Sequence, residues 1–128
     1  MSEYVDDFIS EIPLDKMEIL LQLGKEYSFD PLYCIESEKY FIKLLENYQG
    51  IKEDALKDLL RTIVAKDFEI LDEKPVWVQN PDWQFNNDRP MIFVGQLEKK
   101  YDQQNLQHAY IFYVFWDRES GLTKTTIQ

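Results

Sequence analysis

The spacing of hydrophobic residues along the chain changes near residue 70. Before that point apolar residues recur every three or four positions, which is the period of an amphipathic helix. The apolar sets are Met17, Leu20, Leu21 and Leu23, then Tyr33, Ile35, Tyr40, Phe41, Leu44 and Leu45, then Leu56, Leu59, Leu60 and Ile63. Pro13 precedes the first set, where proline suits the first turn of a helix. The pattern predicts three or four helices over about residues 3–66, packed antiparallel across short connections.

Beyond Asp67 the pattern changes to the alternation and the continuous apolar runs that are typical of strands. The predicted strands are "FEIL" at 68–71, "PVWVQ" at 75–79, "MIFVGQLE" at 91–98, "AYIFYVFWD" at 109–117 and "LTKTTIQ" at 122–128. Gly121 precedes the last strand and supplies the positive φ that its turn needs. Because no helical segment separates these strands, we expect a mainly antiparallel sheet over about residues 68–127.

The run at 109–117 is apolar at successive positions, so we expect it to be the central strand, covered on both faces. Phe112 and Trp116 are then expected in the core on one face. Ile111 and Phe115 are expected in the core on the other face. The last run alternates instead, which suits a strand at the edge of the sheet.

Length and composition fit one globular unit. The chain has 128 residues, of which 45% are apolar and 15% aromatic, enough for one well-filled core. We therefore predict an α+β fold in which N-terminal helices pack on a C-terminal, mainly antiparallel sheet. The expected single domain spans residues 1–128, with a helical part at 1–67 and a sheet part at 68–128.

The formal charge of −10 is unevenly distributed along the chain. Residues 1–74 carry 18 acidic and 9 basic side chains, a balance of −9, whereas residues 75–128 carry 6 and 5, a balance of −1. Such a field repels nucleic acid and anionic lipid and attracts a basic protein. We therefore expect no nucleic-acid or membrane partner. The alternative interpretation is that the charge serves solubility alone.

The first residues of the chain form the candidate binding surface. The acidic residues proposed to contact a partner are Glu3, Asp6, Asp7, Glu11, Asp15 and Glu18. Glu3, Asp7 and Glu11 are spaced four apart, so a helix there would present one acidic ridge. Like charges held this close repel one another, and a basic partner would relieve that repulsion.

The residue types that carry catalysis or metal binding are scarce. The chain holds one histidine, His108, and one cysteine, Cys34, in different halves, too few ligands for a zinc site. No calcium loop, phosphate-binding loop or nucleophile motif is present. The neighbouring carboxylates Glu36 and Glu38 are typical of a solvated helix face. We therefore predict a protein that is not an enzyme, with no catalytic residues, no cofactor and no metal.

Three features bear on where the protein resides. A single cysteine, Cys34, fits a reducing compartment. Residues 1–10 lack the basic and apolar regions of a secretory signal, and the apolar run at 109–116 is too short to span a bilayer. These features predict a cytoplasmic protein.

The aromatic residues of the second half have two interpretations. Trp77, Trp83 and Trp116 would suit stacking on a sugar or a base. A nucleic-acid site also needs basic residues between the rings, and residues 75–97 contain only Arg89. Packing in the core is therefore the favoured role of these rings.

The loop and strand around residues 77–96 carry a distinctive set of residues: Trp77, Gln79, Pro81, Pro90, Met91, Phe93, Gly95 and Gln96. Together with the later strand and turn from Tyr110 to Gly121, these positions make residues 75–128 resemble YwqG-like bacterial domains of unknown function. The resemblance transfers no active site. It implies that Trp77 and Trp83 pin a long loop to the sheet, and that Gln79 and Gln96 satisfy backbone groups of that loop.

The resemblance also points to immunity proteins of polymorphic-toxin systems, among which such domains occur. An acidic inhibitor is steered quickly to the basic substrate groove of a nuclease toxin and needs no catalytic groups. The leading hypothesis is therefore a bacterial immunity protein that blocks a basic toxin. The alternatives are an adaptor of another role, or an enzyme with an unrecognised site around Trp77–Gln96.

Overall fold

The computed structural model describes residues 11–103 and 106–128. Three helices come first: α2 (Leu14–Tyr27), α3 (Ile35–Glu46) and α4 (Glu53–Asp67). They are followed by β1 (Phe85–Asn86), β2 (Arg89–Pro90), β3 (Ile92–Gln103), β4 (Leu106–Trp116) and β5 (Thr123–Ile127). β1 and β2 form a small antiparallel pair, and β3, β4 and β5 form an antiparallel sheet with β4 in the middle. The predicted α+β fold, with β4 as the central strand, is confirmed.

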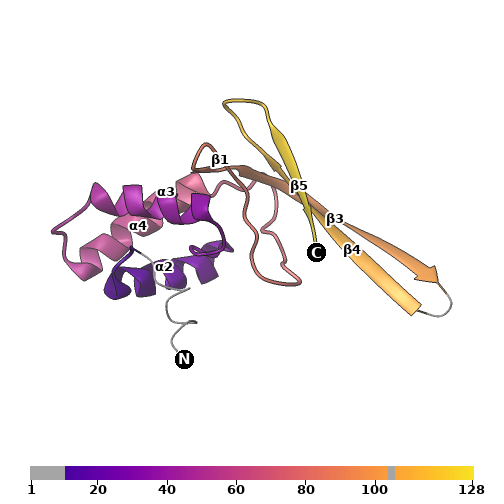
Figure 1. The fold of residues 1–128 in the computed structure, drawn as a ribbon, viewed down its shortest axis with the longest axis horizontal. Coiled ribbons are helices and arrows are strands. Elements are labelled where there is room, and N and C mark those ends of the chain that lie inside the picture. Colours follow the sequence, from indigo (N-terminus) through magenta and orange to yellow (C-terminus); the bar gives the residue numbers. More distant parts are fainter. Residues whose placement is uncertain (1–10, 104–105) are drawn as a thin grey trace.

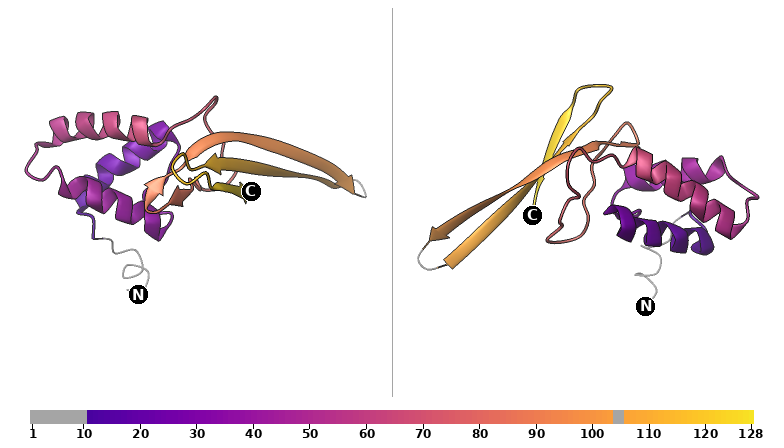
Figure 2. Two further views of the ribbon diagram at one scale, coloured as in Figure 1. Left: turned by 90° about the horizontal axis from the view of Figure 1, so that it is seen from above. Right: turned by 180° about the vertical axis from the view of Figure 1, so that it is seen from behind.

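The helices gather at one end of the molecule, and the hairpin of β3 and β4 extends away from them (Figure 1). The views from above and from behind show the same arrangement (Figure 2). β5 pairs with β4 only between Phe112 and Trp116, so the outer part of the hairpin is a ribbon of two strands. The helices therefore pack against the base of the sheet, and its length is left largely uncovered by them.

One core joins the helices to the sheet. The helical stripes bury Leu20 and Leu23 of α2 and Leu56 and Leu60 of α4 completely. Aromatic rings continue this core toward the sheet through a chain of contacts that runs from Phe29 and Phe41 through Phe68 and Trp83 to Phe93 and Phe115. The period of three and four in the sequence thus reports much of the buried side of the helices, although Leu21, Tyr33 and Ile35 of the predicted sets are exposed.

The sheet is covered on only one face near its centre. The face that carries Tyr113 and Phe115, here called the inner face, is fully buried at both residues. The opposite face, here called the open face, carries Phe112 and Trp116, which are only partly buried. The expectation that β4 is covered on both faces, with Phe112 and Trp116 in the core, is therefore wrong. The helices pack at the end of the sheet, so no described element crosses its open face.

The segments at 68–71 and 75–79, expected as strands, are not strands. The first makes a single parallel bridge, from Ile70 to Phe93. The second is a loop whose backbone bonds to side chains of the sheet. Val76 N donates to Gln96 Oε1 at 2.7 Å, and Tyr113 Oη donates to Val76 O at 2.7 Å. These side chains supply the partners that a neighbouring strand would otherwise offer.

Two tryptophans hold this loop in place, as the resemblance implied. Trp77 stacks on Tyr113 with ring centroids 4.5 Å apart, and its Nε1 donates to Ser28 O at 2.9 Å. Trp83 is buried, and its Nε1 donates to Met91 O at 2.9 Å. The expected role of Gln96 is confirmed. The role expected of the Gln79 side chain belongs instead to Gln128, whose Oε1 accepts from the backbone N of residues 78 and 79.

The inner face contains one buried hydroxyl, Thr126 Oγ1, that has no hydrogen-bond partner among the described residues. A buried polar atom without a partner carries a desolvation cost that folding does not recover. We expect Thr126→Val, which is nearly isosteric, to raise the free energy of unfolding by about 1 kcal/mol, measured by urea denaturation. Thr125→Val, on the exposed face of the same strand, is the matched control and should change it by less than about 0.5 kcal/mol. Equal effects of the two variants would contradict the assignment.

Candidate functional site

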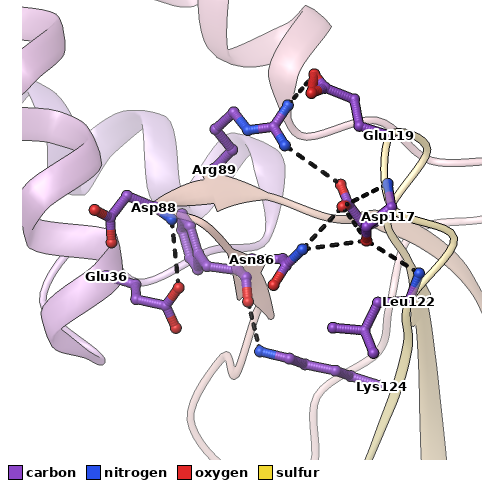
Figure 3. Close-up of polar contacts among 10 residues, drawn as sticks. Glu36, Asn86, Asp88, Arg89, Asp117, Glu119, Leu122 and Lys124 are labelled. Carbon is purple, nitrogen blue, oxygen red and sulfur yellow. Dashed lines mark hydrogen bonds and ion pairs between the residues drawn. The ribbon is translucent and has the colours of Figure 1, made fainter.

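A polar cluster lies where the helices meet the sheet, centred on Asp117 at the end of β4 (Figure 3). The Asp117 side chain is buried, and its Oδ2 accepts from Asn86 Nδ2 at 2.9 Å, from Ser120 N at 3.1 Å and from Ser120 Oγ at 2.5 Å. The guanidinium of Arg89 lies 3.9 Å from Oδ1. Hydrogen bonds from Ser120 and Asn86 lower the pKa of Asp117 below its usual value, with a smaller contribution from the charge of Arg89. Asp117 is therefore held as a carboxylate.

The short hairpin of β1 and β2 brings the partners of Asp117 together. Its two turn residues, Asn87 and Asp88, both have positive φ, 54° and 59°, as a two-residue hairpin turn requires. The turn places Asn86 directly opposite Arg89. The Asp88 N–H points to Glu36 Oε2 at 3.4 Å (Figure 3), which ties the hairpin to α3. The local Asn-Asp turn thus positions side chains on both sides of the junction.

A cavity of about 260 Å³ lies beside this cluster. Most of the charged groups that line it are already paired. Arg89 pairs with Glu119, and Arg118 Nη2 lies 2.8 Å from Glu69 Oε2. The Tyr40 hydroxyl bonds to Asp67, and burial followed by this contact raises the pKa of Tyr40 well above its usual value. Because most of the charged groups around this cavity already pair with one another, we interpret the junction as a structural contact that holds the helices against the sheet.

A second hollow, of about 360 Å³, lies between the approach to α2 and the end of α3. It is lined by Glu11, Ile12 and Pro13 from the first segment, by Lys16 of α2, by Ile42, Leu45 and Glu46 from α3, and by Gln49 just beyond α3. We call this the acidic groove. Ile12 is buried and Ile42 and Leu45 are partly buried, whereas the two glutamates are exposed. Such a site suits an apolar side chain flanked by a positive charge.

α2 also carries exposed apolar and acidic side chains outside the groove. Leu14 is 84% exposed and Leu21 is 45% exposed, with Glu18 between them at helical spacing. Residues at i, i+4 and i+7 lie on one face of a helix, so the two leucines and the glutamate share it. Large apolar side chains left in water beside acidic ones are a feature of protein-binding surfaces.

Three of the six predicted binding residues, Glu11, Asp15 and Glu18, are described, and all three are exposed. Glu11 lines the acidic groove, whereas Asp15 and Glu18 are not among its lining residues. Asp15 is paired with Lys16, whose Nζ is 3.3 Å from Asp15 Oδ2, and this hydrogen bond lowers the pKa of Asp15.

The other three predicted residues, Glu3, Asp6 and Asp7, lie outside the described residues. Sequence reasoning missed the contribution of α3, which comes from Ile42, Leu45 and Glu46. Their spacing of three and four would have placed them on one helix face, but nothing in the chain indicated that this face lies beside Glu11.

The described residues also bear on the chemistry considered from sequence. Cys34 immediately precedes α3 and is half-buried, and burial raises the pKa of its thiol. The His108 side chain lies outside the description. Within residues 11–103 and 106–128, no group of three histidine, cysteine or acidic side chains is placed to hold a metal ion. In the same part of the chain, no helix combines the length and the apolar character needed to cross a bilayer.

Comparison with protein-family models, curated proteins and solved structures gave no match for this chain. The resemblance of residues 75–128 to YwqG-like domains therefore stays a prediction.

Proposed function

We propose that this chain is a non-enzymatic bacterial immunity protein that binds and blocks a basic protein toxin, of nuclease type, in the cytoplasm. The observation that carries the proposal is the acidic groove. Its lining combines apolar residues with two exposed carboxylates and one lysine, in the half of the chain that holds nearly all the net negative charge. The proposal requires no catalytic residue and no cofactor.

In this proposal, charge raises the association rate and favours basic partners over acidic ones. A balance of −9 over residues 1–74 draws a basic partner toward the helices. Complementary potentials raise the association rate and disfavour acidic proteins as competitors. A nuclease toxin fits because its substrate groove must be positive in order to bind phosphates.

In this proposal, apolar contacts slow the dissociation of the complex. Leu14 and Leu21 on α2 are exposed, and Ile42 and Leu45 line the groove. Burying such side chains at the centre of an interface, with charges around them, is how most protein interfaces obtain their binding free energy. The leucines and the groove together would anchor the partner that the carboxylates attract.

Charge reversal at the groove and on the exposed side of α2 tests the proposal. The first partner to examine is the protein encoded directly upstream, because the proposal expects the toxin gene beside that of its inhibitor. We expect the triple variant Glu11→Lys, Glu18→Lys, Glu46→Lys to lower its association rate roughly 10- to 100-fold at low salt, with the difference shrinking as salt rises. Association rates measured by biolayer interferometry at several salt concentrations give both quantities.

The matched control changes the net charge equally but on the sheet side, through Asp72→Lys, Glu73→Lys and Glu98→Lys, all of them exposed. It should keep the association rate within a few-fold of the original. If both triple variants slow association equally, the groove has no specific role and the charge acts only as a general field. If the upstream product does not bind at all, the adaptor hypothesis is favoured instead.

A further inference from the structure

β5 forms one edge of the three-stranded sheet, and no described residue pairs with its outer side. The register of β5 against β4 determines which backbone groups of β5 make no hydrogen bond to β4. Ile111 and Gln128 exchange both of their backbone hydrogen bonds, at 2.9 Å each. In an antiparallel ladder such pairs alternate with pairs that exchange none. Lys124 and Thr126 therefore bond to β4, whereas the N–H and C=O groups of alternate residues Thr123, Thr125 and Ile127 point away from the sheet. We call this row the free edge.

The free edge has few of the features that usually protect an edge strand. It contains no proline, and its one charged residue, Lys124, lies on the inner face, where its Nζ donates to Phe85 O at 2.6 Å. Thr123, Thr125 and Ile127 are all exposed and β-branched. Such residues favour strand pairing.

The opposite edge of the sheet is protected. Its first part is bridged by Ile70, which pairs with Phe93. Farther along, β3 carries Glu98, Lys99 and Lys100 in succession, all exposed, and charges of this kind discourage pairing between edges. The two edges thus differ, because among the described residues the edge at β5 has neither a bridging segment nor such a run of charges.

We propose that the free edge pairs with the free edge of a second copy of this chain, antiparallel and with the two-fold axis at Thr125. Thr125 then faces Thr125 of the other copy, and Thr123 of each copy faces Ile127 of the other. All three pairs join residues with outward backbone groups, so they form about six main-chain hydrogen bonds. The strand is self-complementary in this register, and two three-stranded sheets become one continuous sheet.

Charge favours this surface as the place where two acidic copies meet. Lys124 of one copy lies beside Thr126 of the other, so the register brings no two like charges together. Each chain carries −10 in total, whereas β5 carries one positive charge and no negative one. Repulsion between the rest of the two copies is screened by salt, so the dimer strengthens as ionic strength rises. None of the residues of the acidic groove lies on β5.

The expected dimer is dependent on concentration. Pairing of two five-residue strands buries less than the roughly 800 Å² per partner of a standard stable interface. Sedimentation equilibrium of the full chain should therefore show the mass rising from 15.4 kDa toward twice that value as protein concentration increases. Higher salt should shift this transition to lower concentration.

Thr125→Pro tests the proposed pairing directly. The Thr125 N–H points outward, so a proline there removes a donor of the dimer and none of the fold. We expect it to raise the dimer dissociation constant at least roughly tenfold. Thr125→Val, which keeps the N–H, is the matched control and should leave the constant within about threefold. Thr125→Lys places like charges on the two-fold axis and should weaken the dimer as well. If the proline variant does not fold, the lysine variant tests the proposed pairing in its place.

Amide hydrogen exchange followed by NMR gives an independent readout. Protection at Thr123, Thr125 and Ile127 should increase with protein concentration, whereas Lys124 and Thr126 should be protected at every concentration. The proposal is overturned if the wild-type chain stays at 15.4 kDa up to about 1 mM. It is equally overturned if the folded proline or lysine variant dimerises as strongly as the wild type, because the contact would then lie elsewhere.

Discussion

Truncating Phe115 to alanine is expected to lower the free energy of unfolding by about 3–5 kcal/mol. The ring is completely buried on the inner face of β4, where its centroid lies 5.2 Å from that of Phe93 and 5.5 Å from that of Trp83. Its removal leaves a cavity at the point where the sheet meets the long loop. The surrounding rings are held by several neighbours, so they cannot move in to fill that cavity, and the cost of the truncation stays high. Urea denaturation measures the loss.

The matched control for this prediction is Phe112→Ala, on the same strand but on the open face, where the ring is only partly buried. It should cost about 1–2 kcal/mol. A loss at Phe112 as large as that at Phe115 would show that the open face is covered in solution.

Replacing Asp117 should be the most damaging change of a charged residue. Asp117→Ala removes the acceptor shared by Asn86, Ser120 and Arg89, and leaves their donors without it at a buried position. We expect a loss of about 3 kcal/mol in the free energy of unfolding. Glu119→Gln also disturbs a partner of Arg89, but this side chain is exposed, so the change should cost less than about 1 kcal/mol.

The effect of Asp117 should also depend on pH in a defined direction. The folded state lowers the pKa of its carboxyl below the ordinary value of 3.8, so the ionised form is favoured by folding. The stabilisation is therefore fully present above that ordinary value and is lost as the pH falls through the lowered pKa. The difference in stability between the wild type and Asp117→Asn should accordingly be constant near neutral pH and shrink below about pH 4. A difference that persists unchanged at low pH would mean that the charge of Asp117 contributes nothing.

The helices were predictable because their spacing reports a buried side directly. Leu20, Leu23, Leu56 and Leu60 lie where the period places them. The faces of β4 were not predictable, since Phe112 is as apolar as Phe115 and only the position of the helices decides which ring is covered. Sequence period shows that a strand has an apolar face, but it does not show which layer packs on that face.

The loop at 75–79 shows a second reason for a wrong prediction. Val76, Trp77 and Val78 are strand-forming residues, and their composition favours a strand. Their backbone partners in the structure are the side chains of Gln96 and Gln128, and a glutamine carries no local signal of such a role. The candidate site was predictable only in part for a similar reason, because Glu11 and Glu46 come together through packing of distant segments.

The anchoring of this loop has a consequence for the order of events during folding. Trp77 is tied on one side to Ser28, 49 positions earlier in the chain, and Val78 on the other side to Gln128, 50 positions later. Neither hydrogen bond can form until the segments around Ser28 and Gln128 have folded, and closing loops of this length is entropically costly. The loop is thus expected to order last, after a rate-limiting search set by non-local contacts. Once formed, it couples the two ends of the chain, so that neither half gains its full stability before the other is complete.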